Sequence, residues 1–405
     1  MTNPYLLMVF LYTAVAVVAA LDASSVSLNL LPWFNGLRWF RVHVVTLGLV
    51  TEAIFGLLVA QSVRVANSPD LPAAAQGPRW SVWVTLNTGL ILLLPGIALV
   101  NATLMITGGA LIFGAAVLVL ASLIRATDSA EAPVANRFYG AALVFLLLGI
   151  YIGTGMWFGW TGPLNMSTPV EVHIHANNWG FMSLAFAGLL FGRYPELFGR
   201  AVAWPRSAGR IFWLMTTGAT GLVLGPWFQS EVLSVAGIVL HITATVWLLL
   251  NIVKPLAGDS AWSRPGIWHI VTAYVWILAP VLAAPFVLLN VAGLATVGIE
   301  QNAPQALIYG WVLQFALALI PYLAAKALHP GLAAAIGGNW LGLAAVHAGA
   351  LSLWASMFAG AAQPFLHGAA YALWGGALVI LGIDLLRLLA GRTDSAVHAS
   401  SAAAT

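Results

Sequence analysis

Long apolar stretches recur along the whole of this 405-residue chain, and they constrain its fold more than any other feature. An α-helix needs about 20 apolar residues to cross the hydrocarbon core of a membrane. Hydrophobic residues make up 61% of the chain and charged residues only 7%, against roughly 25% charged residues in an ordinary soluble domain. The sequence therefore predicts an all-α membrane protein that contacts lipid.

By this measure the chain has about twelve transmembrane helices, which we expect to form one bundle over residues 1–392. The polar, alanine-rich tail 393–405 lacks apolar periodicity and is predicted to be disordered. Residues 5–22 are interpreted as the first span, because no basic segment precedes them as in a signal peptide. The predicted spans are 5–22, 42–62, 81–101, 103–124, 138–158, 174–192, 209–227, 232–253, 266–290, 305–325, 333–357 and 366–387.

The basic residues predict the orientation. All but two of the 15 Lys and Arg residues fall in even-numbered loops or in the tail, the exceptions being Arg38 and Arg41. Because basic loops stay on the cytoplasmic side, both termini are predicted to be cytoplasmic, in a chain of the cell's inner (plasma) membrane. A net charge of only +3 gives no reason to expect nucleic acid as a partner. The chain has no Cys, so His, Met, carboxylate or carbonyl groups would have to hold any metal or haem.

Two histidines, His173 and His175, open the sixth span. Each residue of an α-helix turns by about 100°, so these imidazoles leave the helix on nearly opposite sides and can serve two different cofactors. In the predicted orientation His43 and His367 lie at the same outer level. An intramembrane histidine is costly without a ligand or partner, so four at one level predict a binding site. The simpler alternative is that His173 caps the helix or binds a headgroup.

The chain also repeats itself. His43 is followed by Gly48, Thr51 and Gly56-Leu57-Leu58, and His175 is followed at the same offsets by Gly180, Ser183 and Gly188-Leu189-Leu190. A fainter third copy runs from Gln305 to Ile320, which would make three repeats of four helices. Small residues recur in all membrane helices for packing, and for the third copy that simpler interpretation is preferred.

A low-spin haem takes two axial imidazoles from facing helices, and His43 and His175 are the pair that the shared template places symmetrically. His173, on the opposite side, would then hold a second haem. His241 and His347 lie deeper in their spans. Either of them can bond a haem propionate or a second metal, or bond a backbone carbonyl of a neighbouring helix.

These residues resemble the catalytic subunit of heme-copper oxidases, especially the cbb-type oxidases and their nitric oxide reductase relatives. The resemblance covers roughly half of the chain. It implies that His43 and His175 bind a low-spin haem b and that His173 binds a five-coordinate haem. The matching segments are His173-Ile-His175, Gly180-Phe181, Gly188-Leu189-Leu190, Pro195-Glu196-Leu197-Phe198, the glycine-rich segment from Arg137 to Pro163, and Leu37-Arg38 to Arg41-Val42-His43.

The chain departs from this family at the copper site. The family uses an adjacent pair of histidines there, and no His-His occurs in this sequence. The His-x-His helix is also sixth rather than tenth in order. If the last three spans replace the missing block, only His347 and His367 can contribute to copper binding, so the presence of copper stays open. Few carboxylates could carry protons through the membrane, and Glu52 in the second span is the main candidate.

The favoured function is a haem-binding membrane redox protein in respiratory electron transfer or in nitric oxide or oxygen chemistry. Its electron donor would be quinol or a cytochrome, and further subunits fit this interpretation. The chain is also similar in general character to NnrS-like membrane proteins, which are associated with nitric oxide metabolism.

Two alternatives stay open. A twelve-helix transporter would use the histidines for metal or protons, and it predicts midplane histidines and metal without porphyrin. A non-catalytic haem-based sensor or assembly protein would keep the haem site without copper. The sequence does not separate this second alternative from the redox protein.

Overall fold

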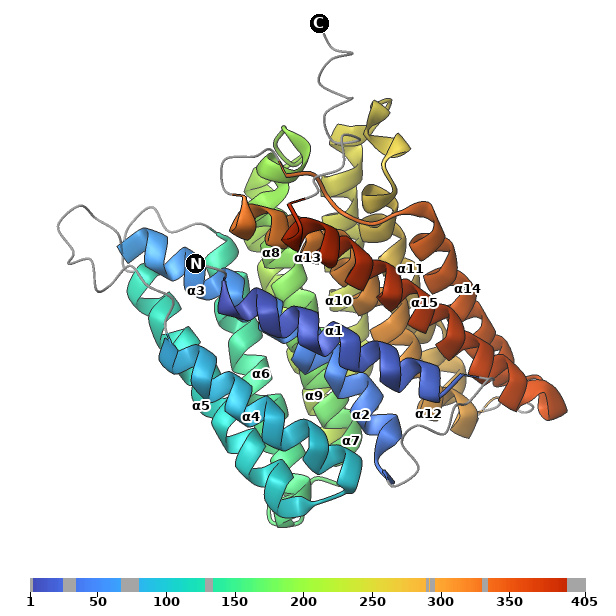
Figure 1. Cartoon of the computed structure of the whole chain (residues 1–405). Helices are drawn as coiled ribbons and strands as arrows, with labels where there is room; N and C mark the ends of the chain where they lie inside the picture. The colour runs from blue at the N-terminus through green and yellow to red at the C-terminus, as the bar shows by residue number, and fades with distance from the viewer. Residues whose placement is uncertain are drawn as a thin grey trace, which may run out of the picture. The chain divides into compact units, whose positions relative to one another are not determined.

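The computed structural model describes residues 3–24, 34–66, 80–127, 134–288, 291, 296–329 and 334–391. Within these residues every regular element is a helix (Figure 1), which confirms the predicted all-α class. The predicted tail 393–405 lies outside the described residues. Contacts divide the chain into two compact units, one of Met1–Ala53 with Ser260–Thr405 and one of Ile54–Asp259.

The first unit is built around a long buried helix. The helix Asn302–Leu328 has 94% of its most apolar stretch buried, and it consists of α12, the π-helical stretch η7 and α13. α1 packs against both η1 and α15, and η1 packs against η7 and α13. The elements of this unit are α1 (Pro4–Asp22), α2 (Leu37–His43), η1 (Val44–Thr51), α11 (Pro265–Leu288), α12 (Thr296–Leu307), η7 (Ile308–Val312), α13 (Leu313–Leu328), α14 (Trp340–Ser356) and α15 (Gln363–Leu389).

The second unit is also organised around an inner helix. A continuous helix from Pro169 to Phe198, made of α7, η3 and α8, packs against α6, and its α7 and η3 portions pack against α9. The elements are α3 (Glu52–Ala66), which begins at the end of the first unit, α4 (Trp80–Leu99), α5 (Ala102–Thr127), α6 (Ala135–Phe158), α7 (Pro169–His175), η3 (Ala176–Met182), α8 (Ser183–Phe198), α9 (Ala208–Phe228) and α10 (Glu231–Val253).

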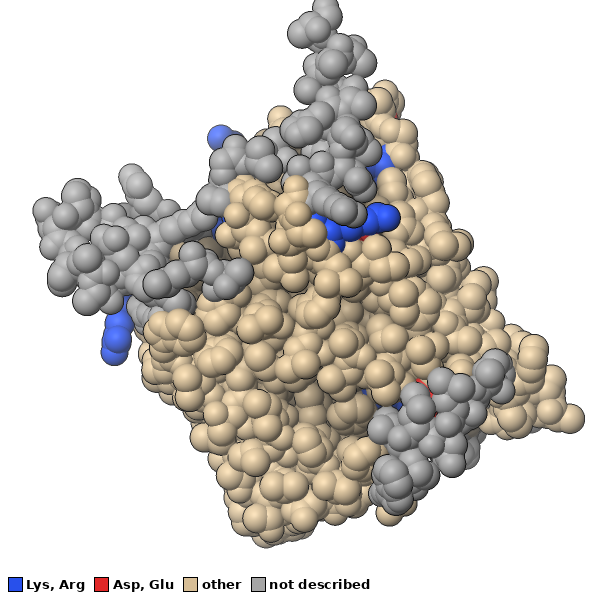
Figure 2. All heavy atoms as spheres, in the orientation of Figure 1, with Lys and Arg blue, Asp and Glu red and all other residues tan. Residues whose placement is uncertain are grey.

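Ten of the helices in the described residues are long and apolar enough to cross a membrane, and Trp340–Ser356 is a shorter apolar helix. Their surface in view is almost free of charged side chains (Figure 2). Most spans agree with the predicted ones to within a few residues, although α14 begins at Trp340 rather than at 333. The predicted sixth span, 174–192, corresponds to the helix made of α7, η3 and α8. That helix is less apolar because two histidines and two asparagines interrupt it.

When each π-helical stretch is joined with the α-helices on either side of it, the described helices fall into three consecutive sets of four, as the repeat predicts. The sets are α1, α2–η1–α3, α4 and α5; α6, α7–η3–α8, α9 and α10; and α11, α12–η7–α13, α14 and α15. In each set the third and fourth helices form a hairpin, namely α4 with α5, α9 with α10 and α14 with α15. Glycines let the backbones touch in these hairpins. A Cβ at Gly108 would lie 2.7 Å from the carbonyl oxygen of Gly89, and one at Gly237 would lie 2.8 Å from that of Gly218. Close backbone approach at small residues is typical of membrane helix pairs.

The second helix of each set contains a π-helical stretch: η1 after His43, η3 after His175 and η7 shortly after Gln305. π-Helices are rare, so three at matching positions are strong evidence for a repeat. The structure therefore favours a third copy over the recurrence of small residues alone. The inner position of these helices also explains why the template is most visible there.

Candidate functional site

His173 lies against α6. Its Nδ1–H donates to the carbonyl oxygen of Gly149 at 2.8 Å. A Cβ at Gly153 would lie 2.8 Å from Cε1 of the imidazole, so the ring rests directly on the α6 backbone. Asn177, one turn later, donates to the carbonyl oxygen of His173 at 2.8 Å and occupies the space that a side chain at Gly149 would need. Gly153 therefore makes room for the imidazole, while Gly149 accepts its hydrogen bond and makes room for Asn177.

His175 turns to a different helix. Its Nδ1–H donates to the carbonyl oxygen of Leu222 in α9 at 2.6 Å. The two rings of the His-x-His segment thus leave the helix toward α6 and α9, as their spacing predicts. All of these contacts lie inside the second unit.

His43 ends α2 in the first unit, and its Nδ1–H donates to the carbonyl oxygen of Trp39 at 2.7 Å, one turn back on the same helix. His175 belongs to the second unit. The pairing of His43 with His175 on one haem stays a prediction.

The three histidines share one chemical property. Each donates Nδ1–H to a backbone carbonyl, which fixes the neutral tautomer and leaves the lone pair on Nε2. Histidines that bind a metal usually donate their other ring N–H to a carbonyl or carboxylate in this way. The donor set therefore fits axial ligation of haem iron through Nε2.

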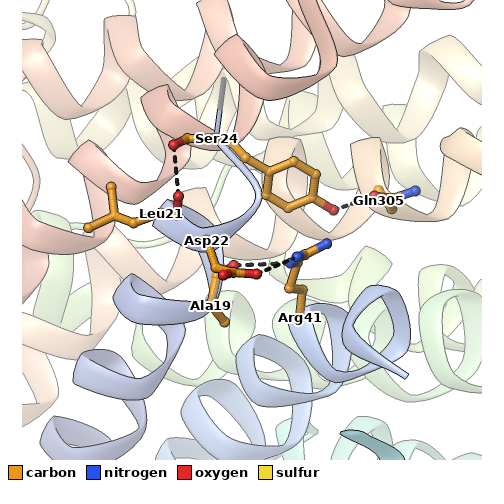
Figure 3. A network of polar contacts seen from close by, with 7 residues as sticks. Ala19, Leu21, Asp22, Ser24, Arg41 and Gln305 are labelled. Atoms are coloured by element: carbon orange, nitrogen blue, oxygen red, sulfur yellow. Dashed lines mark hydrogen bonds and ion pairs between the residues drawn. The ribbon is translucent and has the colours of Figure 1, made fainter. Parts of the chain in front are cut away.

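Arg41 takes the position in α2 that His173 has in the His-x-His segment, two residues before the histidine. Its Nε–H donates to the carbonyl oxygen of Ala19 in α1 at 3.0 Å, much as His173 donates to α6. Nη2 also lies 3.2 Å from the carboxylate of Asp22 (Figure 3). In both sets this position therefore ties the second helix to the backbone of the first.

Gln305, which stands in the histidine position of the third set, is held by hydrogen bonds. Figure 3 shows the Gln305 side chain. Its Oε1 accepts from the hydroxyl of Tyr371 in α15, and its Nε2–H donates to Asn302 at 3.3 Å. The third copy thus keeps the helix geometry while an amide replaces the imidazole.

The two other predicted metal ligands lie in the first unit. His347 uses both ring nitrogens: Nδ1 accepts from Trp276 Nε1–H at 3.0 Å, and Nε2–H donates to the hydroxyl of Thr272 at 2.8 Å. Binding copper would require His347 to give up one of these bonds. The His367 ring packs against Tyr371 with centroids 5.2 Å apart. Within the described ranges, no three His, Asp or Glu side chains gather as a metal site would require, and copper ligation by His347 and His367 stays a prediction.

Glu52, the predicted proton carrier, is fully buried at the start of α3. Its carboxylate interacts electrostatically with the hydroxyl of Tyr12 in α1. This burial is consistent with an inward-facing carboxylate, while a role in proton transfer stays a prediction.

His241 has a structural partner. It is 1% exposed, and its Nε2–H donates to the carbonyl oxygen of Trp179 in η3 at 3.3 Å, while Thr245 donates to its Nδ1. The π-helical stretch explains this bond, because the Ser183 N–H reaches the Asn178 carbonyl five residues back instead of that of Trp179. His241 thus bonds a backbone carbonyl of a neighbouring helix, one of the two roles considered for it.

We expect His241→Leu to lower the free energy of unfolding by about 1–3 kcal/mol, because it leaves the buried Trp179 carbonyl without a donor. Thermal or denaturant unfolding of the purified protein in detergent measures this loss. Thr243→Val on the exposed side of α10 is the matched control, with an expected change within about 0.5 kcal/mol. Equal losses in the two variants would contradict the assigned role of His241.

Sequence reasoning missed the groups that orient these histidines. The acceptors are backbone carbonyls of Gly149 and Leu222, which any residue supplies and which therefore leave no sequence signal. The Gly149 and Gly153 pair, four residues apart on α6, was the only available hint of a helix face that admits a bulky ring. No protein-family model matches the chain, and no curated protein matches its sequence.

Proposed function

We propose that this chain is a haem-binding integral membrane redox protein in which His43, His173 and His175 are the iron ligands. The observation that carries the proposal is the shared Nδ1–H bond of these three histidines to backbone carbonyls. This bond orients each ring and places the lone pair that ligates a metal on Nε2. A haem b bound there would supply one-electron chemistry and, at a five-coordinate iron, a binding position for a diatomic molecule.

The protein's own residues would then make two contributions. His175 is fixed by α9 and His173 by α6, so each imidazole is held in place before a cofactor binds. The buried residues of η3 and α8, which follow the His-x-His segment in the same helix, would shield the inner side of a bound haem from water.

The rest of the proposal follows the sequence. The chain would reside in the inner membrane with both termini in the cytoplasm, and it would accept electrons from quinol or a cytochrome. Nitric oxide and oxygen are the proposed substrates. Because both ring nitrogens of His347 are already bonded, we propose that haem, rather than a copper ion at His347, carries the chemistry.

The deciding experiment is an absorption spectrum of the purified protein from haem-replete cells, before and after dithionite, with metal analysis. We expect stoichiometric haem b with a low-spin component. Well-folded protein without porphyrin would overturn the proposal, and metal without porphyrin would favour the transporter. Nitric oxide binding without turnover would instead indicate the sensor or assembly protein.

A further inference from the structure

The three π-helical stretches share a second feature, which lies five residues after the histidine position. There a glycine is covered by an aromatic ring from the first helix of the same set. A Cβ at Gly48 would lie 2.9 Å from Cγ of Tyr12, and a Cβ at Gly180 would lie 2.5 Å from Cβ of Phe145. In the third set a Cβ at Gly310 would lie 2.6 Å from Cγ of Trp276. Real Cβ atoms essentially never approach so closely, so only glycine admits these rings.

The contact fixes the rotation of the helix about its axis. A π-helical stretch carries extra residues per turn, so the residues before it are rotated relative to those after it. The helix needs an external contact to define where this rotation stops. Phe145 in the Gly180 gap provides that contact at the centre of η3, directly after His175.

We propose that Gly180 and Phe145 are positioning residues that set the direction in which His175 leaves its helix. Gly48 and Tyr12 position His43 in the same way. In the third set Gly310 and Trp276 make the same contact after Gln305, an amide that is not a proposed iron ligand. This inference rests on the proposed function, because the direction of an imidazole matters only where a ligand binds.

The third set supplies a matched control. Gly310→Ala forces a Cβ against Trp276 as Gly180→Ala forces one against Phe145, so both variants disturb packing to a similar degree. Only Gly180→Ala should change the haem. We expect about a tenfold loss of haem per protein, which is the lower end of the effect of mutating groups that orient a metal ligand. The haem that remains should change from low-spin to high-spin, as measured by electron paramagnetic resonance. Gly310→Ala should keep the wild-type haem content and spectrum.

A rescue separates positioning from general damage. Phe145→Gly removes the Cβ, Cγ and Cδ1 atoms that the new Cβ would meet, so Gly180→Ala with Phe145→Gly should recover most of the low-spin signal. If Gly180→Ala does not fold, Phe145→Leu alone serves as the test, and we expect a broadened low-spin signal because the ring no longer fills the gap.

Three results would overturn the inference in protein that binds haem. These are equal spectral changes in the Gly180 and Gly310 variants, absence of rescue in the folded double variant, and an unchanged low-spin signal in Phe145→Leu. Wild-type protein without haem would instead overturn the proposed function itself.

Discussion

Purified His175→Ala is expected to lose the low-spin haem spectrum while its helices stay folded. In the described contacts His175 is held only through Nδ1–H to the Leu222 carbonyl. Its removal would therefore take away one of the two proposed axial imidazoles without breaking a salt bridge or truncating a buried core residue. A low-spin haem with one ligand missing becomes five-coordinate and high-spin. Removing an outer-shell partner of a metal ligand typically costs about 10–100-fold in metal affinity. Because His175→Ala removes the proposed ligand itself, we expect at least about a tenfold loss of the low-spin signal per protein. Absorption and electron paramagnetic resonance spectra measure it.

Free imidazole provides the sharpest control for this prediction. The deleted ring leaves a gap beside Leu222, and added imidazole should enter it and restore the low-spin spectrum. His347→Gln is the matched variant elsewhere, because His347 is also a half-buried histidine but bonds Trp276 and Thr272. It should retain the full low-spin signal. A wild-type spectrum in His175→Ala would rule out this residue as a ligand.

His173→Ala tests the second ligand separately. His173 faces α6 rather than α9, so its loss should remove high-spin haem while the low-spin component persists. A variant that instead loses both components together would show that the two histidines serve a single cofactor.

The sequence was sufficient to predict the spans and the direction of the two rings. Apolar length sets the spans, and the helical turn of about 100° per residue separates the rings of His173 and His175. The template shared by His43 and His175 also led to the three sets of four helices. These features depend on side-chain pattern along one chain segment, which is what a sequence displays.

The contacts that decide what each histidine does were not predictable. Leu222 and Gly149 act through backbone carbonyls, and Trp276 and Thr272 reach His347 from a helix far away in sequence. The π-helical stretches also have no recognised sequence pattern. Yet it is η3 that removes the usual helical donor from the Trp179 carbonyl, which His241 then bonds. The third copy appeared weak in the sequence because Gln305 replaces the histidine.

The second large effect is expected at Arg41, whose guanidinium joins the Ala19 carbonyl and the Asp22 carboxylate at the end of α1 (Figure 3). The side chain of Arg41 is only 13% exposed and that of Asp22 only 8%. Tyr371 adds its ring face 5.4 Å from the guanidinium carbon. Arg41→Met removes the guanidinium that pairs with the buried Asp22 carboxylate, and breaking a buried pair in this way costs about 3–5 kcal/mol.

We therefore expect Arg41→Met to lower the free energy of unfolding in detergent by about 3–5 kcal/mol, measured by denaturant titration. Removing both charges with Asp22→Leu should recover most of this loss, because the cost lies in the unpaired charge rather than in the absence of the pair. Arg387→Met is the control: its pair with Asp384 spans 3.8 Å and Arg387 is 55% exposed, so a change within about 1 kcal/mol is expected. If Arg41→Met is as stable as the control, or if the double variant is no more stable than the single one, water or another donor already satisfies Asp22. In that case the network in Figure 3 would not be what holds α1 to α2.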